Sequence, residues 1–411
     1  MEYGLIGEHL GHSFSKDIHE KLSDRPYELR EITRGDLPNF LARREFKGIN
    51  VTIPYKEAVL PFLDFISDEA RKIGAVNTIV HRDGKLWGYN TDYFGFQALA
   101  DKAGIRFEGR SVLILGAGGA AKTVAAVARD RGASSVTHAV RSPKASGHLA
   151  LADLQAGVPY EIVVNCTPAG MFPHDEERIT DLKAFHQVKG ALDLIYNPLR
   201  TEFILDAEAL GIPAEGGLYM LVAQAVKARE FFDGTTGQTG DAVHNCYQAL
   251  LNAKRNLVLI GMPSSGKSTV GRALAEKTGR PFVDTDRLIA EKAGKSIPQI
   301  FAEEGETAFR ALEADVIREL APRTGLIIAT GGGAILDRQN VRRLRRNGLL
   351  CFIRRDLSLL NATPDRPLSS DTETLRALYE RRKEAYRQAT DRVIDNDGSL
   401  EDTLHKFDAL I

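Results

Sequence analysis

The stretch Leu257-Val-Leu-Ile-Gly261-Met-Pro-Ser-Ser-Gly266-Lys267-Ser268 is an apolar strand sequence that runs directly into a glycine-rich turn. It fits the pattern G-x-x-x-x-G-K-[ST], and Thr269–Lys277 after it has a helical composition. In such a turn, backbone N–H groups and the helix N-terminus surround phosphate oxygens. We therefore predict an α/β nucleotide-binding unit in which Lys267 reaches the β- and γ-phosphates and Ser268 binds Mg²⁺. The expected nucleotide contacts are Gly261, Ser264, Ser265, Gly266, Lys267, Ser268 and Thr269.

A second strand-to-glycine transition lies earlier in the chain. Ser111–Leu115 leads into Gly116-Ala-Gly118-Gly-Ala-Ala121, a G-x-G-x-x-A pattern that indicates a dinucleotide site or, alternatively, close packing of a helix on a strand. The next strand, Ser135–Val140, ends in cationic residues that suit a 2′-phosphate, which favours NADP over NAD. The expected contacts are Gly116, Gly118, Gly119, Ala120, Arg141, Ser142 and Lys144.

The two transitions divide the 411 residues into several domains. Strand-like and helical stretches alternate throughout, which predicts the α/β class. We expect a substrate-binding domain over 1–92, completed by about 236–253, and a Rossmann domain over 93–235. A P-loop domain resembling the nucleoside monophosphate kinases, with a parallel sheet, is expected over 255–411.

Composition narrows the class of protein. Fifty-four Lys and Arg against 55 Asp and Glu leave a net charge of −1, which gives no electrostatic case for nucleic acid or a membrane surface. No apolar run approaches the ~18 residues of a membrane span, and the first residues lack the apolar core of a signal peptide. The cysteines Cys166, Cys246 and Cys351 form no CxxC pair. We therefore expect a cytoplasmic enzyme with small-molecule partners, which could form a homo-oligomer.

Charged residues that follow the turn Gly261–Ser268 indicate a binding site for a phosphoryl acceptor. Asp284-Thr285-Asp286 ends a strand-like stretch, which brings its carboxylates near the phosphate loop unless Asp284 merely ends the strand. Arg310, in Phe309-Arg-x-x-Glu313, suits a carboxylate ligand. Gly331–Gly333 allow close approach of a ligand, while Arg382, taken alone, would fit a solvated helix residue. The run Arg342-Arg-Leu-Arg-Arg346 is interpreted as one basic helical face.

This order of motifs resembles shikimate kinase over residues 255–411. The resemblance implies ATP and Mg²⁺ as cofactors, with Lys267 and Arg366 on the phosphates and Asp284 as the magnesium partner alongside Ser268. It implies that Asp286 lies near the reacting hydroxyl and that the arginines bind the substrate carboxylate. The implied shikimate site consists of Asp286, Arg310, Gly332, Gly333 and Arg382.

Residues that could move a proton lie near the start of the chain. Asn50-Val-Thr52-Ile-Pro-Tyr-Lys56 places a lysine just beyond a strand, and Asn90-Thr-Asp92 supplies a carboxylate. A lysine and an aspartate that converge on one hydroxyl can move its proton while a hydride leaves the same carbon. Lys56 is the expected acid/base. Ser13 and Ser15 suit a substrate carboxylate, although Ser15 could simply cap a helix.

Together with Asn165-Cys-Thr167-Pro-Ala-Gly170-Met171 and the segment Gly217–Gln224, these motifs resemble shikimate dehydrogenase over about residues 1–250. Val140 stands where the NADP-binding pattern of this family usually has asparagine before the arginine. The resemblance implies Lys56 and Asp92 as the catalytic pair, and Thr167, Met171 and Gly217 near NADP(H). The implied substrate contacts are Ser13, Ser15, Thr52, Asn77, Asp92 and Gln224.

The two resemblances imply consecutive reactions on one molecule. NADPH would reduce 3-dehydroshikimate to shikimate, and ATP would phosphorylate shikimate to shikimate 3-phosphate. One alternative is a quinate/shikimate dehydrogenase fused to a non-catalytic, ATP-sensing regulatory domain. Another is a kinase for a different small hydroxylated anion.

Overall fold

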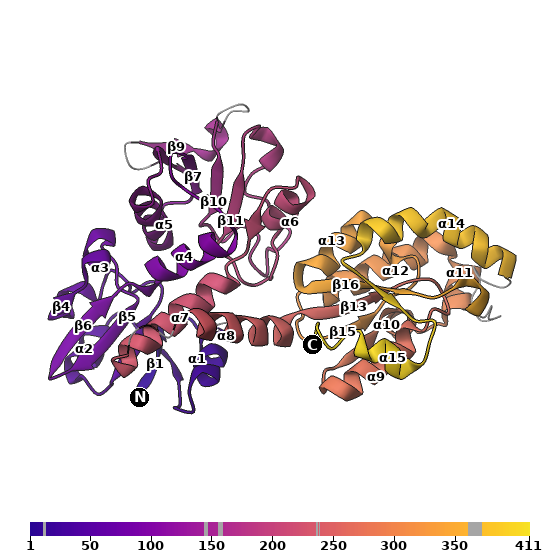
Figure 1. Cartoon of the computed structure of the whole chain (residues 1–411), viewed down its shortest axis with the longest axis horizontal. Helices are drawn as coiled ribbons and strands as arrows, with labels where there is room; N and C mark the ends of the chain where they lie inside the picture. Colours follow the sequence, from indigo (N-terminus) through magenta and orange to yellow (C-terminus); the bar gives the residue numbers. More distant parts are fainter. Residues whose placement is uncertain (11–13, 144–146, 155–158, 236, 238, 361–371) are drawn as a thin grey trace. The chain divides into compact units, whose positions relative to one another are not determined.

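The computed structural model describes the chain except for residues 11–13, 144–146, 155–158, 236, 238 and 361–371 (Figure 1). The chain divides into two compact units, Met1–Leu250 and Leu251–Ile411. Strands and helices alternate in both, which confirms the α/β class. The boundary falls within helix α8 (Thr239–Lys254), and strand β13 begins two residues later at Asn256. A helix therefore passes almost directly into the next sheet, as expected.

The first sheet of the N-terminal unit has the order β2-β1-β3-β5-β6-β4. β1 pairs in parallel with β2 and β3, whereas β5 is antiparallel to β3 and β6. Helix α7 (Leu218–Asp233) packs on this sheet. The ring of Phe232 on this helix lies so close to Gly48 of β3 that a Cβ there would overlap it. The other elements are β1 (Tyr3–Gly7), α1 (Ser15–Leu22), β2 (Glu28–Glu31), α2 (Leu37–Arg43), β3 (Gly48–Val51), β4 (Phe65–Ile66), α3 (Asp68–Ile73), β5 (Thr78–Arg82) and β6 (Lys85–Tyr89).

The second sheet has the order β12-β11-β10-β7-β8-β9, and its neighbours all pair in parallel. All its carboxyl ends therefore meet at one edge, where ligands bind in open α/β sheets. Strand β7 is apolar because helices cover it on both faces. The elements are α4 (Thr91–Lys102), β7 (Ser111–Leu115), α5 (Gly119–Asp130), β8 (Ser135–Val140), β9 (His148–Ala150), β10 (Ile162–Asn165), β11 (Gly190–Asp193), α6 (Glu202–Ala209) and β12 (Ala214–Glu215).

The C-terminal unit has one parallel sheet of order β14-β15-β13-β16-β17. β13 lies at its centre and leads into the first glycine-rich turn. The elements are β13 (Asn256–Ile260), α9 (Lys267–Thr278), β14 (Phe282–Asp284), α10 (Thr285–Ala293), α11 (Ile297–Glu303), α12 (Gly305–Leu320), β15 (Ile327–Ala329), α13 (Arg338–Asn347), β16 (Gly348–Arg354), α14 (Thr372–Ala389), β17 (Arg392–Asp395) and α15 (Leu400–His405).

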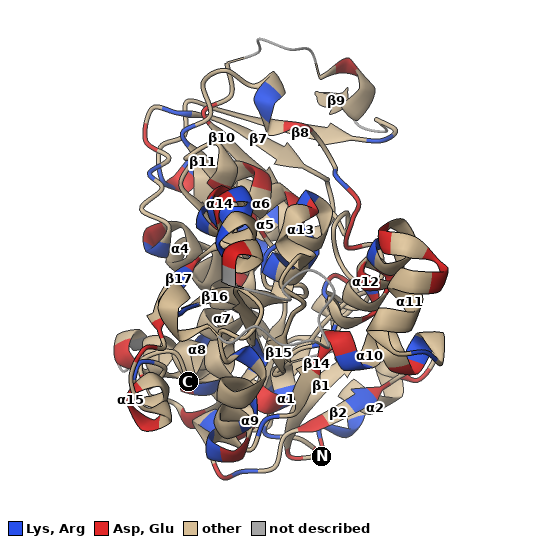
Figure 2. Cartoon of the chain, turned by 90° about the vertical axis from the view of Figure 1, so that its right-hand side faces the viewer, with Lys and Arg blue, Asp and Glu red and all other residues tan. Residues whose placement is uncertain are grey.

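The four arginines of the run on α13 lie on one face of the helix, as predicted, but part of that face is buried. Arg346 is 1% exposed, and Arg345 donates to the carbonyl of Gln388 at 3.1 Å. At about 100° per residue, the four arginines fall within an arc of about 160°, and Leu344 lies on the opposite side of the helix. Figure 2 shows acidic and basic residues interspersed on the neighbouring helices α10–α12. In the part of the chain that the structure describes, no helix has the length and apolarity to cross a membrane.

Candidate active sites

An ion pair lies at the centre of the first site. Lys56 Nζ donates to Asp92 Oδ2 at 2.6 Å, and both side chains are mostly shielded from solvent. Asp92 is fixed because Asn90 caps α4 by accepting from the N–H of Tyr93. The backbone of Lys56 is fixed because its carbonyl accepts from the N–H of Val76 at 2.8 Å. The predicted acid/base pair therefore forms in the structure.

A cavity of about 500 Å³ surrounds this pair. A ligand inside it would contact strands of the first sheet and, beside the second sheet, Ala120 of α5 and Leu194 just after β11, which is what transfer between a substrate and a dinucleotide requires. Ser13 lies outside the described residues. The sequence-predicted residues that line the cavity are Ser15, Thr52, Lys56, Asn77, Asp92, Ala120, Gly217 and Gln224.

Ser15 does not cap α1. It is the first residue of that helix, whose N-cap is Phe14, with no side-chain cap bond. The cap prediction is therefore wrong. An N-cap residue must stand just before the helix, whereas Ser15 is already its first residue. Ser15 lines the cavity instead, 8% exposed.

Asn77 is held in place by buried hydrogen bonds. Its Oδ1 accepts from the N–H of Thr91 at 2.7 Å. Asn50 donates to the carbonyl of Asn77 at 3.3 Å and accepts from Tyr27 Oη at 2.7 Å. The sequence analysis gave Asn50 no role, although an amide on β3, two residues before Thr52, was a usable signal. Gln224 joins the network as acceptor from Thr91 Oγ1 at 3.3 Å.

Tyr196 also lines the cavity and was missed from the sequence. Its ring lies 5.2 Å from that of Phe14, centroid to centroid. Burial raises the pKa of its phenol, so the hydroxyl stays protonated at neutral pH and can donate. No local motif marks this tyrosine, because it becomes part of the site only when α1 and the segment after β11 meet.

The glycine-rich turn after β7 fits a ligand and not only helix packing. Gly116 has φ +114°, and a Cβ there would lie 3.2 Å from the carbonyl oxygen of Cys166. A Cβ on Gly118 or Gly119 would meet no atom within 4 Å. Packing therefore does not explain these two glycines, whereas a dinucleotide approaching the N-terminus of α5 does.

Arg141 and Ser142 directly follow β8, beside that turn; Lys144 lies outside the described residues. Arg141 Nη2 donates to Glu177 Oε1 at 2.8 Å. Met171 is 44% exposed. Thr167 is anchored because both its N–H and its hydroxyl donate to Asn165 Oδ1, at 3.0 and 2.8 Å.

Asp193 anchors the loops that carry Thr167 and Tyr196. Its carboxylate accepts from Asn165 Nδ2 at 3.1 Å, from the N–H of Ile195 at 3.0 Å and from Thr201 Oγ1 at 2.6 Å. The residue is 0% exposed. Burial raises its pKa to about 6, although these three bonds and the N–H of Leu194 oppose the shift.

The second site forms around the turn after β13. Gly261 and Gly266 have φ +153° and +92°, which glycine adopts without strain. Lys267 Nζ donates to the carbonyls of Gly261 and Met262 at 2.9 and 2.8 Å. Asn396, from the end of β17, donates to the carbonyl of Ser265 at 2.8 Å. Ser264 and Ser265 lie in the turn, and Ser268 and Thr269 in the first turn of α9.

The donor set beside the turn fits Mg²⁺. Ser268 Oγ donates to Asp284 Oδ2 at 2.7 Å, so a hydroxyl and a carboxylate already meet there. Mg²⁺ takes oxygen ligands and usually needs only one or two from the protein besides phosphates and water. Accordingly, the absence of a cluster of three or more His, Cys, Asp or Glu among the described residues does not count against it.

The glycine run after β15 brings the remaining charged groups together. A Cβ at Gly331 would lie 2.6 Å from Asp286 Oδ1 and 2.9 Å from Glu313 Oε1. A Cβ at Gly332 would lie 3.1 Å from Pro263 of the phosphate loop, and one at Gly333 would overlap the Arg310 guanidinium. These glycines therefore let two carboxylates, an arginine and the phosphate loop meet around one space.

Arg382 also belongs to this buried region. It is 5% exposed, so the solvated-helix interpretation is wrong, and burial lowers its pKa. Arg310 Nη1 donates to Glu313 Oε2 at 2.7 Å, whereas Glu313 Oε1 has no hydrogen-bond partner among the described residues. Burial raises the pKa of Glu313. Arg366 lies outside the described residues.

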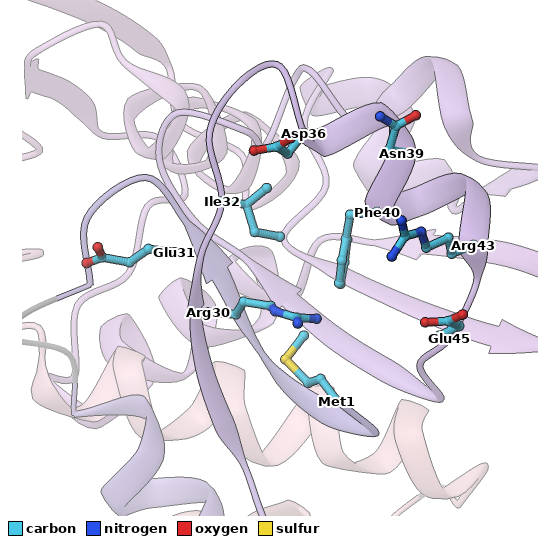
Figure 3. A pocket seen from close by; sticks show the side chains of 9 residues that line it. All are labelled: Met1, Arg30, Glu31, Ile32, Asp36, Asn39, Phe40, Arg43 and Glu45. Carbon is cyan, nitrogen blue, oxygen red and sulfur yellow. The ribbon is translucent and has the colours of Figure 1, made fainter.

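Two further hollows contain no residue that the sequence analysis assigned to a site. One, of about 220 Å³, lies beside the phosphate loop and is lined in part by Met262, Arg355 and Asp397. The other, of about 340 Å³, lies between β2 and α2 (Figure 3). Its charged lining side chains are exposed, and Arg30 lies 5.6 Å over the ring of Phe40.

Comparison with known families shows similarity for both units. A family model described as shikimate kinase matches residues 263–409, and one described as shikimate dehydrogenase substrate binding domain matches residues 5–79. The chain is 39% identical over 249 residues to the shikimate dehydrogenase (NADP(+)) of Clostridium perfringens strain 13, which covers 56% of this chain and 92% of the relative. The corresponding protein of Geobacillus kaustophilus is 36% identical, with coverage of 62% and 98%.

Solved structures show the same similarity. A Thermus thermophilus shikimate 5-dehydrogenase, in complex with NADP(H) and shikimate, is 32% identical with a TM-score of 0.53 and covers 61% of this chain and 99% of its own. A chorismate mutase/shikimate 5-dehydrogenase fusion from Clostridium acetobutylicum is 35% identical with a TM-score of 0.57, with coverage of 60% and 96%.

Proposed function

Because this chain belongs to the shikimate dehydrogenase family and carries a shikimate kinase domain after it, we propose that it catalyses two consecutive reactions on one molecule. In the first, 3-dehydroshikimate is reduced to shikimate with NADPH. In the second, shikimate is phosphorylated to shikimate 3-phosphate with ATP and Mg²⁺. The three cysteines are free thiols, which supports a reducing compartment such as the cytoplasm.

In the reduction, NADPH supplies the hydride when it is bound beside Gly118 and Gly119. Lys56 donates a proton to the ketone oxygen, and Asp92 holds the ammonium group in position through their 2.6 Å contact. Asn77, Gln224 and Tyr196 orient the ring, since their amide and phenol groups line the same cavity. Ser13 and Ser15 bind the substrate carboxylate.

In the phosphorylation, ATP would supply the γ-phosphoryl group to the shikimate hydroxyl and leave as ADP, and Ser268 and Asp284 would hold Mg²⁺. Lys267 exchanges its two loop carbonyls for phosphate oxygens, and Arg366 adds a second cation. Asp286 orients the attacking hydroxyl, while Arg310 and Arg382 bind the carboxylate. The unsatisfied Glu313 Oε1 accepts from a substrate hydroxyl.

The strongest support for this proposal is the glycine run Gly331–Gly333, around which Asp286, Arg310 and the phosphate loop come together. A domain that only senses ATP has no need of a carboxylate and an arginine facing its phosphate loop. A hydroxylated carboxylate as phosphoryl acceptor requires both groups.

The test combines purified protein with 3-dehydroshikimate, NADPH, ATP and Mg²⁺, and identifies products by mass spectrometry. Shikimate 3-phosphate that requires both cofactors supports the proposal. Asp286→Asn should leave shikimate as the end product, and Lys56→Ala should stop ketone consumption, while Lys72→Ala, which removes an exposed lysine, should change neither. Shikimate without phosphate in the unmodified protein would support the alternative ATP-sensing domain, and an untouched ketone would overturn the first reaction.

A further inference from the structure

The ion pair between Arg141 and Glu177 spans the strand that carries the dinucleotide turn. Arg141 follows β8, and Glu177 lies in the segment after β10. The sheet order places β7 between these two strands, and all three run parallel. The pair therefore joins the two segments that flank the carboxyl end of β7, where Gly116 begins the turn.

The segments that carry the pair are fixed against this turn. Gly116 N–H donates to the carbonyl of Ala139 at 2.8 Å. A Cβ at Gly116 would lie only 3.2 Å from the carbonyl oxygen of Cys166, so the turn also packs closely against the end of β10. Glu177 is fixed by its neighbour, because Arg178 donates to Asp206 at 2.9 Å and to Glu202, whose side chain is 0% exposed. Arg178 thus anchors the loop to α6, and Glu177 remains beside Arg141.

We propose that Glu177 determines how strongly this chain distinguishes a dinucleotide with a 2′-phosphate from one without it. The proposal rests on the proposed function, in which Arg141 contacts the 2′-phosphate. That phosphate must compete with Glu177 for the same guanidinium group, and its negative charge is repelled by the carboxylate. A free ribose 2′-hydroxyl instead donates to the carboxylate while Arg141 stays paired.

Glu177 therefore supplies the acidic group that NAD-binding sites usually carry at the end of the strand after the glycine turn. Here the end of β8 carries an arginine, and the carboxylate comes from a different loop. Both partners are exposed, at 76% and 42% of their side-chain areas, so the effect on affinity is moderate, at roughly two- to fivefold for each dinucleotide.

The test measures dissociation constants of the full chain for NADP⁺ and NAD⁺ separately. Glu177→Gln should tighten NADP⁺ binding and weaken NAD⁺ binding, each by roughly two- to fivefold, and high salt should reduce the NADP⁺ effect. Glu161→Gln is the matched control, because it removes the ion pair between Glu161 and Lys189 at 2.6 Å. Glu161 lies just before β10, at the end of the sheet opposite the dinucleotide turn. This change should leave both dissociation constants unchanged.

Arg141→Gln separates this inference from the function on which it rests. It should weaken NADP⁺ binding at least tenfold and change NAD⁺ binding little. If Arg141→Gln behaves in this way and Glu177→Gln leaves the ratio of the two constants unchanged, the role of Glu177 is refuted and the NADP site stands. If Arg141→Gln does not affect NADP⁺, both the placement of the 2′-phosphate and the role of Glu177 are overturned.

Discussion

Protonation of Asp193 should stabilise the N-terminal unit as the pH falls. Its pKa of about 6 in the folded chain lies above the usual 3.8, because the carboxylate is fully buried. Folded Asp193 therefore binds its proton at a higher pH than unfolded Asp193, so the free energy of unfolding rises as pH falls from about 6 to about 4. The separation of the two pKa values corresponds to about 3 kcal/mol.

The assay compares the unmodified protein with Asp193→Asn by urea unfolding at several pH values. Trp87 is the single tryptophan and lies on β6, so its fluorescence follows the N-terminal unit. From pH 7 to pH 4, the stability of the unmodified protein relative to Asp193→Asn should increase by about 2 kcal/mol, most of the full difference. Asp101→Asn, which changes an exposed aspartate, should show no such trend against the unmodified protein. Parallel pH curves, or a difference of opposite sign, would refute the reasoning.

Other changes test the two sites separately through kcat and KM of each half-reaction. Lys56→Ala should lower kcat of the reduction by about 10²- to 10⁴-fold and leave the kinase unchanged, since it removes the proton donor; an equal loss in both reactions would indicate misfolding instead. Gly333→Ala should raise the kinase KM for shikimate without affecting reduction, because its Cβ overlaps the Arg310 guanidinium, and an unchanged KM would contradict that crowding. Asp284→Asn should raise the Mg²⁺ concentration needed for half-maximal kinase activity several-fold, whereas an unchanged Mg²⁺ titration would exclude Asp284 as a metal partner.

The sequence predicted those parts of each site that are encoded within a few consecutive residues. Strands β7 and β13 end at a glycine turn because the turn needs glycine at Gly116, Gly261 and Gly266, and such local requirements leave a visible pattern. Lys56 and Asp92 were recognised because each stands at the end of its own motif.

Groups that acquire their role through distant partners were not predicted. Tyr196, the Asn50 link to Tyr27 and the Arg141–Glu177 pair all join segments that the chain brings together only after folding. The burial of Arg382 was missed for a related reason, because composition around an arginine does not reveal what packs over it. Such contacts depend on sheet order and loop path, which periodicity does not specify.

The hydrogen bond from Asn396 to Ser265 has a consequence for the order in which the two units mature on the ribosome. Asn396 Oδ1 itself accepts from Thr403 Oγ1 at 2.8 Å, so the phosphate loop is stabilised by a residue 131 positions further along the chain than Ser265. The N-terminal unit is complete by Leu250 and can fold while the rest is still being synthesised. A nascent chain arrested before residue 396 would therefore already contain the whole N-terminal unit, whereas its phosphate loop would still lack the hydrogen bond from Asn396 to Ser265.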